Sequence, residues 1–127
     1  MIKDFAEWHA IKAKIDDTQN LPSFQEREIW WCGIGVNIGH EEDGKGLYFR
    51  RPVLIIRKFN RHIFWGLPLT TQIKEKHYYH RIIFQDKEQC AMLSQLRLWE
   101  GKRLNTKMGK LDYDQFTGIR EKLKAML

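Results

Sequence analysis

The spacing of apolar residues along the chain predicts a helix at each end and short strands between them. Apolar residues recur every three or four positions within residues 4–17, which is the period of an amphipathic helix. The same period returns near the other end, where Asp112 is suited to cap a helix and Gln115 stands three positions later. Residues 17–25 contain turn-forming residues and predict a linker after the first helix.

Five or six short strands are expected in the middle of the chain. A continuous apolar run over residues 52–57 suits a strand buried on both faces. The other strands are expected at residues 28–32, 63–67, 78–84 and 90–96 and around residues 107–109, with a turn at residues 86–88. Short strands between two helices predict an α+β, mostly β fold, with a small and strongly curved antiparallel sheet or barrel.

Composition supports one globular domain. The 127 residues are 43% hydrophobic and carry a net charge of +6, which argues against disorder and points only weakly to a polyanionic partner. No apolar run is long enough to span a bilayer, and the first residues lack the apolar core of a signal peptide, so we expect a cytoplasmic protein. Cys32 and Cys90 lie too far apart for a disulfide framework or a paired-cysteine zinc site.

Two motifs that resemble cofactor sites are better explained as ordinary structure. Glycines at positions 33, 35 and 39 resemble a dinucleotide-binding loop, but the acidic residues 41–43 follow where a helix would be needed. His77 and His80 are three positions apart, so on a strand they point to opposite faces and cannot share a metal. We therefore expect no cofactor and no metal.

Two basic clusters are compatible with a nucleic-acid surface or with a solvated face. The first cluster contains no acidic residue, and the second is interleaved with Tyr78 and Tyr79. Their members are Arg50, Arg51, Arg57, Lys58 and Arg61 in the first, and Lys74, Lys76, His77, His80 and Arg81 in the second. Cations that bind phosphates, beside aromatic rings that stack on unpaired bases, are typical of single-stranded nucleic-acid sites.

Three further positions have both a chemical and a structural interpretation. His40 stands beside Glu41, which would favour its cationic form and suit it to proton transfer, although the residues alone favour an ordinary loop histidine. Thr70 leaves a buried strand, where it either faces a site or forms a turn. Gln95 and Arg97 share one side of an alternating segment and either face the same rim or hold the structure together.

The order of these segments resembles the MazF and PemK toxin family of type II toxin–antitoxin systems, over residues 26–127. No segment is specific alone, but five occur in the family's order. They are Glu28-Ile-Trp-Trp, then Gly39-His40-Glu41 with Arg51-Pro52-Val-Leu-Ile-Ile, Leu67-Pro-Leu-Thr70, Leu93-Ser-Gln95-Leu-Arg97, and Lys102-Arg103-Leu104 with Met108-Gly109-Lys110-Leu111. The histidine at position 40 is typical of the PemK-like branch.

The resemblance implies an SH3-like barrel that forms a homodimer, cuts single-stranded RNA at short sequence motifs without a metal, and is neutralised by a cognate antitoxin. It implies that the ribose 2′-hydroxyl attacks the adjacent phosphate, leaving a 2′,3′-cyclic phosphate and a 5′-hydroxyl. Arg51 would stabilise the developing charge, Thr70 would bind the phosphate, and His40 or Glu41 would transfer protons. Gln95 would hold the RNA, and the basic clusters, with Arg50, Arg57, Lys58, Lys74, Lys76 and Tyr78, would border the groove.

Departures from the family pattern leave other functions open. Ser94 stands where family members commonly carry an acid, and residues 1–25 add a helix before the barrel domain at residues 26–127. One alternative is a barrel of the same fold that poisons a protein target such as DNA gyrase. Another is an RNA-binding module without catalysis. Arg51 and Thr70 beside a His-Glu loop favour the nuclease.

Overall fold

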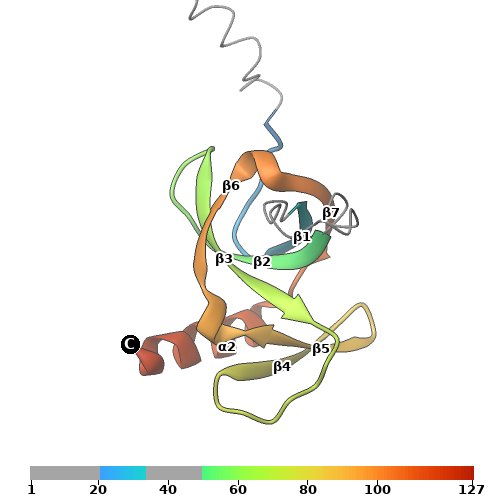
Figure 1. The fold of residues 1–127 in the computed structure, drawn as a ribbon, viewed down its shortest axis with the longest axis vertical. Coiled ribbons are helices and arrows are strands. Elements are labelled where there is room, and N and C mark those ends of the chain that lie inside the picture. Colours follow the sequence, from blue (N-terminus) through green and yellow to red (C-terminus); the bar gives the residue numbers. More distant parts are fainter. Residues whose placement is uncertain (1–20, 34–49) are drawn as a thin grey trace, which may run out of the picture.

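A computed structural model describes residues 21–33 and 50–127 (Figure 1). The helix predicted over residues 4–17 and the catalytic candidates His40 and Glu41 lie outside the described residues. Within them the chain forms seven strands, two short 3-10 helices and one α-helix. The strands are β1 (Glu28–Gly33), β2 (Arg50–Lys58), β3 (Ile63–Thr70), β4 (Tyr79–Phe84), β5 (Lys87–Met92), β6 (Arg97–Glu100) and β7 (Leu104–Lys110). The helices are η4 (Leu93–Gln95), η5 (Gly101–Arg103) and α2 (Tyr113–Met126).

All paired strands are antiparallel, in the order β4-β5-β3-β2-β1-β7, with β6 added beside β3. β3 connects the β4–β5 hairpin to the rest of the sheet. Its first half pairs with β6, and its last two residues pair with β5. Figure 1 shows strands β1, β2, β3, β6 and β7 curving around one another, with the β4–β5 hairpin and α2 below them. The predicted small antiparallel barrel with a C-terminal helix is confirmed.

The core has two parts, on opposite faces of β2. Val53 and Ile55 pack inside the barrel with Phe24, Phe64 and Trp99. The alternate residues of the strand, Leu54 and Ile56, pack on the other face, where Phe116 and Ile119 of α2 cover the sheet. Because successive side chains of a strand point to opposite faces, a strand between two apolar layers needs an unbroken apolar run. The prediction of a doubly buried strand at residues 52–57 is therefore confirmed.

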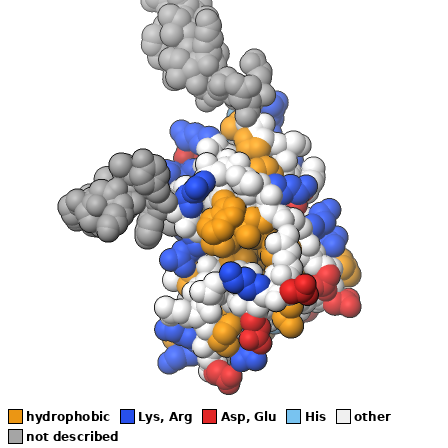
Figure 2. Space-filling view, turned by 90° about the vertical axis from the view of Figure 1, so that its right-hand side faces the viewer, with side chains coloured by type: hydrophobic (Ala, Val, Ile, Leu, Met, Phe, Trp, Pro, Cys, Tyr) orange, Lys and Arg blue, Asp and Glu red, His pale blue; other side chains and the backbone are white. Residues whose placement is uncertain are grey.

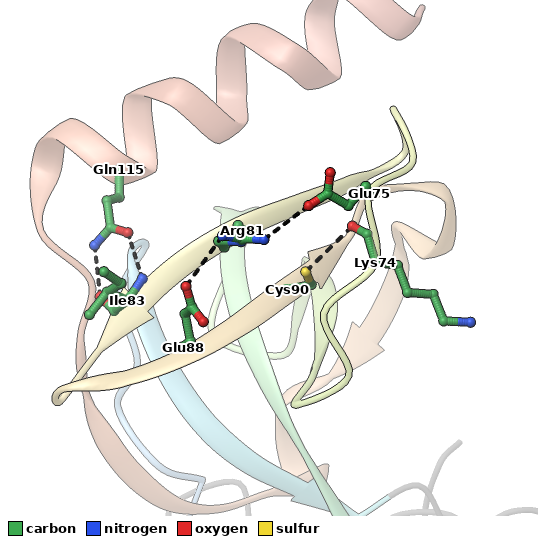
Figure 3. Close-up of polar contacts among 7 residues, drawn as sticks. All are labelled: Lys74, Glu75, Arg81, Ile83, Glu88, Cys90 and Gln115. Atoms are coloured by element: carbon green, nitrogen blue, oxygen red, sulfur yellow. Dashed lines mark hydrogen bonds and ion pairs between the residues drawn. The ribbon is translucent and has the colours of Figure 1, made fainter.

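The helix α2 is fixed to the sheet by its first turn. Asp112 caps it, accepting a hydrogen bond from the backbone N–H of Gln115 at 3.1 Å, as the sequence predicts. The side-chain amide of Gln115 also binds the backbone of Ile83, accepting from its N–H at 2.8 Å and donating to its carbonyl oxygen at 2.9 Å (Figure 3). Gln115 thus occupies the outer edge of β4, where no other strand of the described residues pairs.

Two expected elements differ from the structure. The β4–β5 turn lies at Gln85 and Asp86, both with positive φ, and not at residues 86–88. The strand expected at residues 90–96 is wrong, because β5 ends at Met92, η4 follows, and β6 is a separate strand. The chain must leave its pairing with β4 and reach the first half of β3, and a short 3-10 turn makes that change of partner.

Candidate functional site

A hollow of about 440 Å³ lies where β2 begins and β3 ends. Other walls come from β1, from the β4–β5 turn and from β7. Its lining residues are Trp31, Arg50, Arg51, Pro52, Leu69, Thr70, Thr71, Phe84, Gln85, Lys87, Gln89 and Met108. Figure 2 shows the side of the molecule on which β3 ends, with apolar side chains gathered at the centre and Lys and Arg side chains around them. We call this space the Thr70 hollow.

Arg51 and Thr70 come together in this hollow although 19 positions separate them (51 to 70). Arg51 is held beside Cys32 of β1, and Thr70 beside Cys90 of β5, by the pairing of their strands. The Thr70 hydroxyl oxygen accepts a hydrogen bond from the backbone N–H of Gln72 at 3.1 Å. Since this bond uses a lone pair of the oxygen, the hydroxyl proton remains available to donate to an anion.

A second hollow, of about 320 Å³, adjoins Arg51 and contains Gln95. It is lined by Arg51, Pro68, Met92, Gln95, Arg97 and Trp99. The structure thus places two of the predicted residues, Arg51 and Gln95, around one space, and Arg51 belongs to both hollows. The Gln95 amide nitrogen lies 3.8 Å from the sulfur of Met92, a weak contact that leaves the amide exposed. We call this space the Gln95 hollow.

The electrostatics of both hollows favour an anion. None of the described residues that line them is acidic. Within residues 21–33 and 50–127, no carboxylate forms an ion pair with Arg51 or Arg97. Uncompensated guanidinium groups bind phosphate through two parallel hydrogen bonds. The arrangement can therefore hold a phosphate and stabilise negative charge that develops on it.

Cys32, which pairs with Arg51 across the sheet, cannot supply a nucleophile. Burial raises the pKa of its thiol to about 12, and the lowering effect of Arg97 and Arg103 does not offset this. A thiol that stays protonated at neutral pH is unreactive. Cys90 is also buried. Among the described parts of the chain, no group of three or more His, Cys, Asp or Glu residues is arranged to hold a metal ion.

The structure places Arg57 and Lys58 away from both hollows. Arg57 lines a third hollow of about 250 Å³, between β3 and the end of α2, together with Trp65 and Leu123. The Lys58 ammonium donates to the carbonyl oxygen of Phe24 at 2.8 Å and lies 4.7 Å from the centre of its ring. Lys58 therefore ties the segment before β1 to the barrel.

Lys74, Lys76 and Tyr78 lie in the segment between β3 and β4 and line neither hollow. Figure 3 shows the Lys74 side chain directed away from the hairpin, while its carbonyl oxygen faces the Cys90 thiol. The Tyr78 ring is half-buried and lies 5.3 Å from that of Tyr79, centre to centre. Their predicted contact with RNA stays a prediction, made for a surface next to the two hollows.

Several lining residues of the Thr70 hollow were not among the residues predicted from the sequence. The strand pattern does contain a signal for Trp31, because successive side chains of a strand point to opposite faces and its neighbour Trp30 is buried. Lys87 comes from β5, which pairs with β3, and Met108 comes from β7, which pairs with β1; these pairings depend on the whole topology, and the sequence gives no local signal for them. His40 and Glu41 lie outside the described residues, so their roles remain predictions.

One family model matches most of the chain, and solved structures share its fold. The model for the PemK-like, MazF-like toxins of type II toxin–antitoxin systems matches residues 25–127. No curated protein matches by sequence. The fold is similar to that of an endoribonuclease solved in complex with its cognate antitoxin from a mycobacterial species, with 16% identity and a TM-score of 0.63 over 81% of this chain and 93% of the other.

Two further solved structures share the fold. MazF from Deinococcus radiodurans is 14% identical, with a TM-score of 0.62 over 83% of this chain and 96% of the other. A structure described as an Mtb toxin is 18% identical, with a TM-score of 0.54 over 61% of this chain and 92% of the other. In the described part of the chain, α2 is the one long helix, and it is too short and too polar to cross a membrane.

Proposed function

Because the chain belongs to the PemK-like, MazF-like toxins of type II toxin–antitoxin systems, we propose that it is an endoribonuclease that cuts single-stranded RNA at a short base sequence. The observation that carries the proposal is the meeting of Arg51 and Thr70 in one basic hollow. A barrel that served only to hold a protein partner would have no need of a guanidinium, without a carboxylate partner among the described residues, beside a hydroxyl that can donate. RNA supplies the phosphate that such a pair binds.

The proposed reaction is attack by the ribose 2′-hydroxyl on the adjacent phosphorus. The bond from that oxygen to phosphorus forms, the bond to the 5′-oxygen breaks, and the products are a 2′,3′-cyclic phosphate and a 5′-hydroxyl. The nucleophile belongs to the substrate, so this reaction calls for positioning, proton transfer and charge stabilisation. Arg51 would stabilise the two charged oxygens of the transition state through its paired N–H groups. The Thr70 hydroxyl would donate to one of the same oxygens.

Proton transfer is assigned to His40 and Glu41. One group must take the proton of the 2′-hydroxyl and another must give a proton to the leaving 5′-oxygen. Ser94, where family members commonly carry an acid, is a poor proton donor at neutral pH, and it lies exposed in η4 next to Gln95. We therefore assign the acid–base pair to the His-Glu sequence at positions 40 and 41, with Gln95 holding the RNA.

An antitoxin and a second copy of the chain are the expected partners. A similar structure contains an endoribonuclease with its cognate antitoxin, which supports a partner of this kind here. A partner with an acidic segment would be attracted to the hollows, where Arg50, Arg51 and Lys87 lie without acidic neighbours among the described lining residues. Such a segment would compete directly with RNA for Arg51.

The test is cleavage of a long single-stranded RNA by the purified protein in EDTA, with identification of the new ends. We expect 5′-hydroxyl ends from the wild type. Arg51→Ala should reduce the rate by at least about a hundredfold, because it removes the main charge-stabilising group. Thr70→Ala should reduce it less, and His40→Ala and Glu41→Ala should change its pH dependence. Arg120→Ala, an exposed arginine on α2 outside both hollows, is the control and should cut like the wild type.

Three results would contradict the proposal. Equal cutting by wild type and Arg51→Ala would show that the activity resides elsewhere or in a contaminant. RNA that is bound and never cut would indicate an RNA-binding module. A protein that neither binds nor cuts RNA would direct attention to a protein target.

A further inference from the structure

We propose that the Gln95 hollow holds the base next to the cut phosphate and that Arg97 selects there a base with two adjacent hydrogen-bond acceptors, guanine or cytosine. The inference rests on the proposed function, because it names the substrate preference of the same site. Four observations about this hollow carry it.

The first is the position of the hollow. Arg51 lines both hollows, so a phosphate bound at Arg51 lies between the Thr70 hollow and the Gln95 hollow. The base of a nucleotide whose phosphate is held there is within reach of the Gln95 hollow. The Gln95 hollow has about 320 Å³, enough space for a base, and its floor is apolar, with Pro68, Met92 and Trp99.

The second is the way Arg97 is held. Its guanidinium carbon lies 3.9 Å from the centre of the Trp99 ring, which is the distance of a stacked pair. A guanidinium stacked on an indole keeps a defined plane, while its N–H groups at the edge remain free for other partners. Within the described residues no carboxylate uses them.

The third is that Trp99 itself is fixed. Its side chain is only 3% exposed, and its indole N–H donates to the carbonyl oxygen of Gly66 at 3.3 Å. Gly66 leaves the ring its space, since a Cβ at that position would lie 3.1 Å from Trp99 Cδ1. Arg97 therefore stacks on a rigid support, which reduces the entropy that it loses when it binds a base.

The fourth is the hydrogen-bonding chemistry of the residues at the rim. A guanidinium offers only donors, so it matches two adjacent acceptors, such as O6 and N7 of guanine or N3 and O2 of cytosine. Adenine and uracil present no two adjacent acceptors on their Watson–Crick or Hoogsteen edges, so one N–H of Arg97 would lack an acceptor. The exposed amide of Gln95 offers both an acceptor and a donor for the remaining polar groups of either base.

The first test maps the 5′-hydroxyl ends left on a long RNA of known sequence. The wild type should cut with guanine or cytosine at one fixed position beside the cut. Arg97→Lys keeps the charge and loses the paired donors, so it should still cut, with that preference reduced about tenfold. Arg120→Lys changes another exposed arginine that lies over an aromatic ring, Phe116, and should leave the preference unchanged. Adenine or uracil at that position, or an unchanged preference in Arg97→Lys, would overturn the inference while leaving the nuclease intact.

The second test does not require cleavage. Thymine decamers with one central guanine, 7-deazaguanine, cytosine or adenine are bound to the protein and followed by fluorescence anisotropy. The decamer with guanine or the decamer with cytosine should bind the wild type at least about fivefold more tightly than the decamer with adenine. Arg97→Lys should bind that decamer and the adenine decamer equally. If guanine is the base, 7-deazaguanine, which lacks N7, should lose the advantage; if cytosine is the base, guanine and 7-deazaguanine should bind alike. Equal binding of all four decamers to the wild type would overturn the inference, whether or not the protein cuts RNA.

Discussion

The contact between Gln115 and the edge of β4 predicts a measurable contribution to stability, which becomes pH-dependent when the amide is replaced by a carboxylate. The Gln115 amide makes two hydrogen bonds to the backbone of Ile83, at 2.8 and 2.9 Å, and also contacts Asp112. A hydrogen bond of this kind contributes about 0.5–1.5 kcal/mol to the free energy of unfolding. Ile83 is 57% exposed, so water can replace part of what is lost. We expect Gln115→Ala to lower the free energy of unfolding by about 1–2 kcal/mol.

The variant Gln115→Glu distinguishes the contributions of the two hydrogen bonds to Ile83, because a carboxylate keeps the accepting one and loses the donating one. The introduced carboxylate can still accept from the Ile83 N–H, but it faces the Ile83 carbonyl oxygen and the Asp112 carboxylate without a proton to donate. When protonated, it donates again, so folding raises its pKa above the ordinary value of about 4.3. Its stabilising contribution is therefore complete below pH 4.3 and is lost as the pH rises through the raised pKa.

The assay is urea unfolding at fixed protein concentration between pH 3.5 and pH 8, with each variant compared with the wild type at the same pH. At neutral pH, a loss of about 1–2 kcal/mol moves the midpoint by about 0.5–1 M for a slope of about 2 kcal/mol per M. Gln115→Glu should match Gln115→Ala or fall below it at pH 7 and approach the wild type at pH 3.5. Gln72→Glu, at an exposed position, controls for the added charge. Midpoints for both Gln115 variants that stay equal to the wild type at pH 7 would refute the reasoning.

Three further predictions concern buried groups. Burial raises the pKa of the Glu28 carboxyl, but donors that include Lys107 at 3.0 Å outweigh this and leave the pKa below its usual value. The stability that Glu28 supplies should be present above about pH 4.5 and lost as the pH falls. Glu28→Gln should lower the free energy of unfolding by about 2 kcal/mol at pH 7, and urea unfolding should show a weaker dependence of that free energy on pH. Cys32, with a pKa of about 12, should resist iodoacetamide at pH 8 until urea unfolds the chain, and mass spectrometry of the labelled peptide checks this. Gly66→Ala would place a Cβ 2.7 Å from Val53 Cγ1 and 2.9 Å from Phe64 Cε2, so it should lower the thermal midpoint, with a cost of about 1–3 kcal/mol, seen by circular dichroism.

The sequence predicts those elements whose periodicity depends on burial alone. The run at residues 52–57 indicates a strand between two apolar layers, and Asp112 marks the start of α2 correctly. The strand expected at residues 90–96 fails because hydrophobicity does not show where a chain changes its pairing partner. Met92 and Leu93 are both buried, yet β5 ends between them. The β4–β5 turn begins one residue before its predicted position because Gln85 has a positive φ, which glutamine does not commonly signal.

The candidate site is predictable in part. Arg51, Thr70 and Gln95 are found from motifs whose order resembles a family, and the structure places them around two adjoining hollows. A count of basic residues is less informative, because it does not distinguish Arg51, which lines both hollows, from Lys58, which binds the carbonyl oxygen of Phe24. Charge along a sequence shows how many cations there are, and the pairing of strands decides which of them meet.

The wide sequence span of the Thr70 hollow has a consequence for the time at which activity begins. Its walls run from Trp31 to Met108, and β7, which carries Met108, pairs with β1. No shorter stretch of chain can therefore complete it. At about 5–20 residues per second, the ribosome adds the segment between these two walls over several seconds. The proposed ribonuclease activity would therefore begin only after β7 has emerged from the ribosome and paired with β1.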